Sequence, residues 1–252
     1  MKSKILIFTL LIFSLPLFAQ LNVEKWKVFE ITLNGTSTGN PFKEVTFSGK
    51  FIYDKDTISV PGFYDGNGIY KIRFMPTKEG KWAYSTISND KKLNNKKGSF
   101  VCNPALQNNH GPVIVKDTFY FAYSDNTPHH SFGTTCYGWV HQGDSLASLT
   151  LKTLSKGYFN KIRMCIFPKS YDWNNNEPFY YPFEGKPLKN WDFSRLNPAF
   201  FRNIERRIQQ LDSLGIEADL IVFHPYDRWG FSSMNRETET MYIDYIIARF
   251  AA

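Results

Sequence analysis

The fold of the second half of the chain is decided by the stretch FNKIRMCIF, residues Phe159–Phe167. This apolar run follows a segment that ends at Gly157 and stops at Pro168. Short apolar runs with such boundaries are typical of strands buried in a parallel sheet. On either side of this run we expect two further strands, at Ser131–Tyr137 and Ile216–His224.

Helical patterns separate and follow these three strands. Asp144 or Ser145 can cap a first helix that ends at Gly157, and Asn197 caps a second helix with Pro198 at its first position. A third helical pattern follows the last strand. Residues recur at helical spacing at Leu146, Leu149 and Leu154, at Phe200, Phe201, Ile204, Ile208 and Leu211, and at Met241, Tyr242, Tyr245, Ile246, Arg249 and Phe250. This alternation predicts a parallel sheet covered by helices.

A doubly wound sheet and a barrel share this alternation. The first strand-to-helix turn reads Gly138-Trp139-Val140-His141, with bulky residues where a dinucleotide-binding fingerprint needs glycines. The absence of the fingerprint favours a barrel. Only three strand-helix units fit between His130 and Ala252, whereas a full (β/α)8 TIM barrel has eight in about 250 residues. We therefore predict the first part of such a barrel.

The first half of the chain has a different pattern. Between Val23 and Val101 apolar residues alternate with period two, and strand-like runs occur at Val45–Ile52, Ile69–Phe74 and Lys81–Ile87 with turn-rich segments between them. Short strands with such spacing predict an antiparallel β-sandwich of the immunoglobulin-like type. The protein is thus expected to be multi-domain: a signal peptide at residues 1–19, the sandwich at 20–103, a linker at 104–129 and the partial barrel at 130–252.

The signal peptide is predicted from Lys2 and Lys4, followed by an apolar run to Phe18 and a cut after Ala19. The alternative, a membrane anchor, is disfavoured because the run is shorter than the ~20 residues that span a bilayer. We expect a secreted or periplasmic protein, or one held at the cell surface, with no transmembrane segment once the signal is removed.

Composition excludes several classes of function. Of the 252 residues 42% are hydrophobic and 17% aromatic, which excludes global disorder. Much of the net charge of +7 lies in the lysines of a predicted hairpin loop, so no nucleic-acid partner is expected. The three cysteines form no CxxC motif, and the adjacent His129 and His130 point to opposite faces of a strand. We therefore expect no metal and no cofactor.

Two motifs of the predicted barrel carry a family resemblance. The segment Gly157–Met164 (GYFNKIRM) resembles the second-strand motif of the cellulase-like glycoside hydrolases of clan A, and the segment Phe223–Tyr226 (FHPY) resembles their site-lining histidine segment. The resemblance implies that Arg163 lies beneath the sugar and contacts the nucleophilic carboxylate. It also implies that His224 lines the site.

A narrower resemblance covers almost the whole chain after the signal. The motifs VPGFYDG (60–66), RFMP (73–76) and EGKW (79–82) resemble the N-terminal domain of unknown function that precedes apiosidase-like barrels in polysaccharide-degrading bacteria. The motifs FGTT (132–135), with Trp139, and HPYDRWG (224–230) resemble the start of such a barrel.

The chain departs from this family in its catalytic carboxylates. Clan A hydrolases carry the acid/base glutamate at the end of the fourth strand and the nucleophile at the end of the seventh, so the pair is expected beyond the end of this chain. Four carboxylates lie in or near the strand-end loops instead: Asp172, Glu177, Glu184 and Asp227. Loop solvation or turn formation is the alternative role for the first three, and pairing with Arg228 or loop capping is the alternative for Asp227.

The residues predicted to bind substrate are Arg163, His224, Tyr137, Trp139, His141, Trp173, Asp227 and Trp229. Aromatic faces stack on sugar rings, although each ring alone could serve packing instead. The structural alternatives are a salt bridge for Arg163, which needs a negative partner if buried, and a core position for His224. In the sandwich, Trp26, Trp82 and Tyr84 are expected to pack in the core or between domains.

These observations predict a secreted glycoside hydrolase that acts on a polysaccharide or oligosaccharide by a retaining mechanism with two carboxylates. Two alternatives stay open. One is a non-catalytic carbohydrate-binding or surface protein, and the other is an inactive fragment, whose open three-stranded sheet would expose an unpaired edge.

Overall fold

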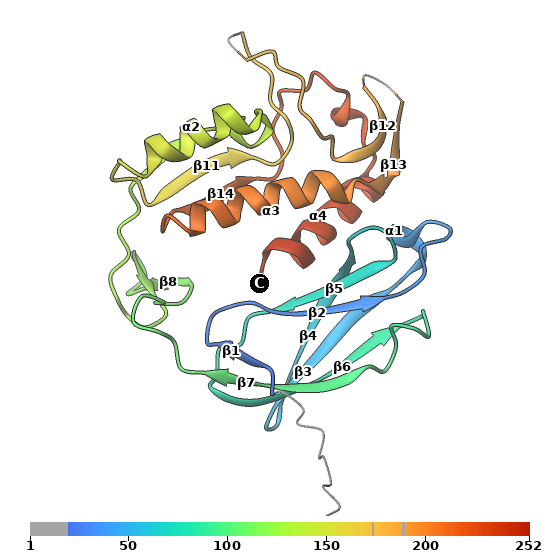
Figure 1. Cartoon of the computed structure of the whole chain (residues 1–252), viewed down its shortest axis with the longest axis vertical. Helices are drawn as coiled ribbons and strands as arrows, with labels where there is room; N and C mark the ends of the chain where they lie inside the picture. The colour runs from blue at the N-terminus through green and yellow to red at the C-terminus, as the bar shows by residue number, and fades with distance from the viewer. Residues whose placement is uncertain (1–19, 173, 188–189) are drawn as a thin grey trace, which may run out of the picture.

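The computed structural model describes residues 20–172, 174–187 and 190–252. Two parts are visible in Figure 1, a strand-rich part at the N-terminus and a smaller parallel sheet with helices. Two of these helices, α3 (Pro198–Asp212) and α4 (Arg236–Phe250), lie between the parallel sheet and the strand-rich part. The helical layer therefore connects the two parts.

The N-terminal part is one sheet of seven strands in the order β1-β7-β6-β3-β4-β5-β2. All neighbouring pairs among the described strands are antiparallel except β1 and β7, which are parallel. The expectation of a purely antiparallel arrangement is wrong for this pair, and an immunoglobulin-like topology stays a prediction. The elements are β1 (Asn22–Glu24), β2 (Phe29–Asn34), α1 (Pro41–Glu44), β3 (Phe47–Tyr53), β4 (Asp56–Tyr64), β5 (Ile69–Phe74), β6 (Gly80–Ser88) and β7 (Lys97–Asn103).

The core of this part is aromatic. Strand β4 pairs with β3 through residues 56–61 and with β5 through residues 62–64, so it joins two halves of the sheet. Their side chains pack against each other: the rings of Phe29 and Phe100 stack at 4.0 Å, and those of Phe51 and Phe74 at 4.1 Å. Trp82 is buried among them and donates its indole N–H to the Lys78 carbonyl at 2.9 Å, which confirms it as a core residue.

The second part contains the three expected strands as a parallel sheet in the order β10-β11-β14. They are shorter than predicted because their terminal residues lie outside the hydrogen-bonded ladder. The alternation of strand and helix is observed, while closure into a barrel stays a prediction. The elements are β10 (Gly133–Thr135), the 3-10 helix η1 (Trp139–His141), α2 (Asp144–Leu154), β11 (Lys161–Cys165), α3, β14 (Glu217–Ile221), the 3-10 helix η2 (Phe231–Ser233) and α4.

Two hairpins were not expected. One, β8 (Val113–Lys116) with β9 (Tyr120–Tyr123), lies in the predicted linker. The other, β12 (Phe183–Lys186) with β13 (Asn190–Leu196), lies mostly in the predicted loop 168–193. Its paired ends Phe183 and Leu196 are both buried in the core of the second part, and this burial stabilises the pairing. The domain boundaries at 103/104 and 129/130 stay predictions.

Helix α3 begins where the sequence predicts. The Asn197 side chain accepts a hydrogen bond from the Ala199 amide at 3.1 Å, and Pro198 occupies the first turn. The helix ends at Asp212, and Gly215 follows with φ +69°. Both ends of α3 are thus set by local sequence.

The two parts are joined by a buried ion-pair network. Arg249 of α4 is almost completely buried and binds Asp65 at 2.9 Å and Glu205 at 2.7 Å. Arg73 of β5 also pairs with Glu205 and donates to the Arg249 carbonyl at 2.7 Å. Tyr245 donates its hydroxyl to the Tyr64 carbonyl at 2.9 Å. Because both charges of each pair are mostly withdrawn from water, this network fixes the relative position of the two parts.

Candidate functional site

The candidate site lies at one edge of the parallel sheet. Because β10, β11 and β14 are parallel, their carboxyl ends meet at this edge, where ligands bind in sheets of this kind. The register places Thr135, Arg163 and Asp219 in one row across the three strands. Ile162 and Met164 alternate with Arg163 and are buried in the core of this part.

Arg163 forms a salt bridge within this row. Its Nε and Nη2 lie 2.9 Å and 2.8 Å from Oδ2 of Asp219. Asp219 is therefore the negative partner that was predicted for a buried Arg163. The Arg163 side chain is 56% exposed, however, and is therefore not buried. The pair holds the guanidinium in a fixed orientation and leaves part of it accessible.

His224 follows β14 and is held neutral. Its Nε2 lies 3.2 Å from the Phe167 carbonyl oxygen, and because a carbonyl only accepts, Nε2 carries the proton. Burial lowers the pKa of His224, and nearby Lys169 lowers it further. Its Nδ1 is buried and has no hydrogen-bond partner within the part of the chain that the structure describes. The neutral ring therefore keeps one acceptor unpaired beside the strand ends.

A lysine lies among tyrosines beside His224. Nζ of Lys169 is 4.1 Å from the ring centre of Tyr137 and 4.1 Å from that of Tyr226. The Tyr226 and His224 ring centres are 6.1 Å apart. The predicted Tyr137 and His224 are thus brought together, through two residues that the prediction did not include. We call Tyr137, Lys169, His224 and Tyr226, together with Arg163 in the middle of β11, the strand-end site.

Two predicted aromatic residues belong to the core instead. Trp139 is 5% exposed and its indole N–H lies 3.1 Å from the Met164 sulfur. Trp229 is 1% exposed and donates to Oε2 of Glu177 at 2.8 Å. The prediction that they contact sugar is corrected here, because neither ring offers a free face. Burial of these two large apolar rings stabilises the segments that carry them, η1 and the loop before η2.

Asp227 closes its own loop. Its carboxylate accepts from the backbone amides of Trp229, Gly230 and Ser232 at 2.8 to 3.0 Å. Burial alone would raise its pKa, but these hydrogen bonds lower it, so it stays ionised. This arrangement matches the capping alternative rather than substrate binding. The predicted Trp173 lies outside the described residues.

Glu177 is also committed to structure. Its carboxylate accepts from the Tyr181 hydroxyl at 2.5 Å and pairs with Arg228 at 2.6 Å, besides the bond from Trp229. These contacts lower its pKa, with the Tyr181 hydrogen bond as the main cause. The ionised, fully partnered group holds the long loop in place, which matches the structural alternative for this residue.

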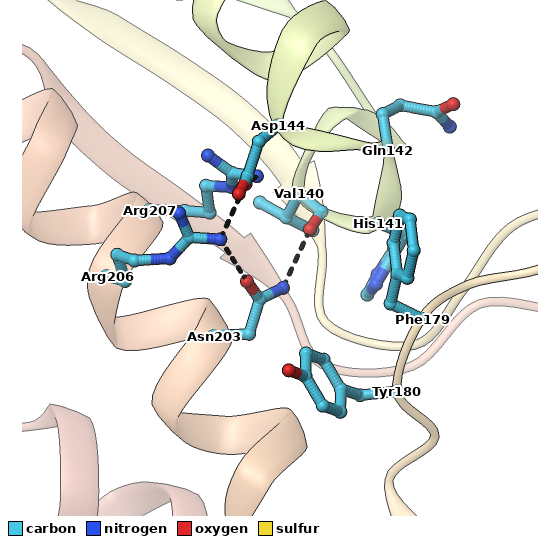
Figure 2. Close-up of a pocket in the computed structure, with 9 residues that line it drawn as sticks. All are labelled: Val140, His141, Gln142, Asp144, Phe179, Tyr180, Asn203, Arg206 and Arg207. Carbon is cyan, nitrogen blue, oxygen red and sulfur yellow. Dashed lines mark hydrogen bonds and ion pairs between the residues drawn. The ribbon is translucent and has the colours of Figure 1, made fainter.

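His141 lines a separate pocket, shown in Figure 2. The ring is buried, stacks on Phe200 at 5.6 Å and places Nε2 3.3 Å from the Cys165 carbonyl. Burial lowers its pKa to about 4. The pocket has a volume of about 140 Å³ and is lined by Val140, His141, Gln142, Asp144, Phe179, Tyr180, Asn203, Arg206 and Arg207. His141 thus lines this pocket, and it also interacts with His224 of the strand-end site, which lowers the pKa of His141 further.

At the strand-end site the sequence reasoning missed Lys169 and Tyr226, and it missed Asp219 as the partner of Arg163. Asp219 is a charged residue within an apolar strand, and the period of two that places it beside Arg163 could have identified it. Lys169 and Tyr226 gave no signal of their own, because loop residues are brought together only by the fold.

The described part of the chain contains neither a candidate metal cluster nor a membrane-spanning helix. Among residues 20–172, 174–187 and 190–252, no group of three or more His, Cys, Asp or Glu side chains could hold a metal ion. In the same ranges no helix combines the length and apolar character needed to cross a membrane.

Comparison with protein families gives two matches. Residues 22–89 match the model of a domain of unknown function, DUF5060. Residues 116–252, more than half of the chain, match the model of the apiosidase-like catalytic domain. No functionally curated protein matches the chain significantly.

Among solved structures, a candidate glycoside hydrolase from Bacteroides vulgatus is 45% identical, with a TM-score of 0.88 over 92% of this chain. The match covers 47% of that protein, so the chain spans about half its length. A family 39 glycoside hydrolase from Bacteroides cellulosilyticus is 13% identical over 90% of this chain and 39% of its own, with a TM-score of 0.26. The Bacteroides ovatus family 5 xyloglucanase, solved with a heptasaccharide, is 8% identical. The match covers 81% of this chain and 43% of the xyloglucanase, with a TM-score of 0.23.

The two low scores carry no argument about this fold. The family matches and the Bacteroides vulgatus structure agree with each other. They also agree with the resemblance of the sequence to an N-terminal domain of unknown function followed by an apiosidase-like domain. The chain belongs to the apiosidase-like family, with a DUF5060 domain preceding the matched catalytic region.

Proposed function

We propose that this protein is an exported glycoside hydrolase that cleaves glycosidic bonds in a polysaccharide. The observation that carries the proposal is the strand-end site: a neutral histidine and two tyrosine rings gather around Lys169 where the parallel strands end, and Arg163, oriented by Asp219, lies in the middle strand of the same sheet. This arrangement suits a sugar ring, and it occurs in a chain of the apiosidase-like family. The export signal proposed for residues 1–19 fits a substrate outside the cell.

In this proposal Arg163, His224 and the two tyrosines of the strand-end site have defined roles. Arg163, held by Asp219, orients the nucleophilic carboxylate, as the family resemblance implies. His224 accepts a hydrogen bond from a sugar hydroxyl through Nδ1, and the rings of Tyr137 and Tyr226 contact its apolar face. Binding and orientation of the sugar are therefore the contributions of the three described strands.

The proposed chemistry is retaining hydrolysis with two carboxyl groups about 5 Å apart. One attacks the anomeric carbon while the other protonates the leaving oxygen, and water then hydrolyses the glycosyl-enzyme. The resemblance expects these groups on a fourth and a seventh strand, and the described parallel sheet contains three strands. Glu177 and Asp227 are not proposed for this role because their oxygens are already engaged.

The test incubates the protein, produced at the full length of its Bacteroides vulgatus relative so that a fourth and a seventh strand are included, with a panel of plant and microbial oligosaccharides. The expected result is release of reducing sugar whose first-formed anomer, followed by NMR, has the configuration of the substrate. Arg163→Ala should lower turnover by about 100-fold or more, the loss typical of a group acting on the transition state. Inverted product would contradict the retaining mechanism, and full activity of the variant would contradict the role of Arg163.

A non-catalytic carbohydrate-binding function is the second candidate. It is favoured by one observation, that the carboxylates of Glu177 and Asp227 serve loop structure. Titration with the same oligosaccharides separates the two functions. Binding that His224→Ala weakens, without any release of reducing sugar, would favour this second function.

A further inference from the structure

The pocket of Figure 2 shares no lining residue with the strand-end site. Its walls come from η1, the start of α2, the loop before β12 and helix α3. Its volume of about 140 Å³ is below the roughly 300–1,000 Å³ of pockets that bind drug-sized ligands. A ligand of this pocket is therefore no larger than about one sugar residue.

Positive charge exceeds negative charge in the pocket. Arg206 and Arg207 both donate to the same oxygen, Oδ1 of Asp144, at 2.8 Å each. Two guanidinium groups thus share one carboxylate, whose side chain is 72% exposed and screened by water. The charge balance leaves room for one more anionic group.

Arg207 provides the second observation. Its side chain is 1% exposed, yet its Nε has no hydrogen-bond partner among the residues that the structure describes. Nη1 of Arg207 donates to the Gln210 side chain at 3.0 Å, which leaves Nε as the unpaired nitrogen of this guanidinium, and a buried unpaired donor is a sign of a missing acceptor. Burial and the neighbouring Arg206 lower the pKa of Arg207, as expected for an incompletely compensated charge.

The opposite wall of the pocket suits a sugar ring. Phe179 and Tyr180 expose their rings to this space, and the hydroxyl end of Tyr180 turns toward α3 in Figure 2. Asn203 bridges Arg206 and the Val140 carbonyl, at 2.9 Å and 3.0 Å. Polar groups thus face aromatic rings across a space of one ring's size, which is how proteins enclose carbohydrate.

We propose that this pocket binds a single sugar residue that carries a carboxylate. The carboxylate pairs with Arg206 and Arg207, and the ring lies against Tyr180 and Phe179. The choice of a sugar among possible carboxylates rests on the proposed function, but binding here requires no hydrolysis. The site would hold an acidic sugar unit away from the strand ends.

The test measures binding of D-glucuronate to the 252-residue chain by isothermal titration calorimetry, with D-glucose and acetate as probes that lack the charge or the ring. Glucuronate should bind at least about tenfold more tightly than either. Arg206→Gln should weaken glucuronate binding about tenfold or more, since hydrogen bonds to charged groups contribute about 1.5–3 kcal/mol each. The matched control is Arg236→Gln, which removes the same charge from the exposed start of α4 and should bind as the wild type does.

Each other result overturns a part of the inference. Equal binding of glucose would exclude recognition of the charge, and equal binding of acetate would exclude recognition of the ring. Unchanged affinity in both Arg206→Gln and Tyr180→Ala, each checked for a native melting temperature, would exclude this pocket. Glucuronate binding by the 252-residue chain, together with no cleavage of oligosaccharides by the longer protein, would support this inference while the proposed hydrolase function fails.

Discussion

At the scale of single residues, burial decides the charge of the histidines. His141 is the last residue of η1 and packs against Phe200 and the end of β11. Burial lowers its pKa to about 4, although backbone hydrogen bonds act in the opposite direction. The pKa of His224 shifts in the same direction. Both rings are therefore neutral in the folded protein at neutral pH.

This shift predicts a loss of stability in acid. Between pH 6.5 and pH 4 the unfolded chain binds a proton at His141 that the folded chain does not, so the free energy of unfolding falls as pH falls through this window. The full contribution, present above pH 6.5, is about 3 kcal/mol. Urea unfolding of wild type and His141→Gln at pH 7.5 and pH 4.5 should show a steeper loss for the wild type. The exposed His130→Gln should behave as the wild type, and equal slopes for all three would contradict the assignment.

A second prediction concerns Arg249. Removal of its charge in Arg249→Met takes one arginine partner from each of the buried Asp65 and Glu205, at a cost of about 3–5 kcal/mol in the free energy of unfolding. Chemical denaturation followed by circular dichroism gives this value. Arg236→Met removes the same group from an exposed position and should change stability little. A similar small effect of both substitutions would show that the network contributes no net stability.

At the scale of elements, local signals fixed the helices well. Helix α3 begins at the predicted cap, and Asn197 also donates to the Tyr181 carbonyl at 2.9 Å, so one side chain joins the helix to the long loop. Asn197→Ala should lower the free energy of unfolding by about 1 kcal/mol, within the usual range for caps. Urea midpoints give the comparison with Asn108→Ala, an exposed asparagine in the connecting segment. Equal midpoints for the two variants would exclude a stabilising cap.

The hairpins show the limit of local signals. The segment that contains β12 and β13 is rich in aromatic, proline and polar residues and was predicted as a loop. Its pairing depends on Phe183 and Leu196. Both are buried in one core cluster with residues of α3 and α4, which come later in the sequence. Non-local burial of this kind overrides weak local preference for strand.

At the scale of the whole molecule, the ion-pair network makes the two parts one unit. The guanidinium carbons of Arg249 and Arg73 lie 4.8 Å and 5.1 Å from the ring centre of Phe63, so apolar and ionic contacts coincide at the junction. Tyr245 also packs on Phe63 at 5.8 Å. The parts are thus held by packing as well as by charge.

This junction predicts cooperative unfolding. In urea, far-ultraviolet circular dichroism, dominated by α2, α3 and α4, should report the same midpoint as hydrogen exchange of amides in β3 and β6. Arg249→Met should separate the two midpoints, because the network that couples the parts is broken. Two distinct transitions in the wild type would contradict the coupling.

The sequence by itself determined the types of the main elements, their order, the cap of α3 and the family, because periodicity, capping residues and short motifs are local properties. It also identified Arg163, His224 and Tyr137 as residues near the strand ends. Only the tertiary structure decided which side chains meet: Asp219 beside Arg163, Lys169 between Tyr137 and Tyr226, and the withdrawal of Trp139 and Trp229 into the core. The physical reason is that contact and burial depend on strand register and loop path, and these follow from packing of the whole chain rather than from any single segment.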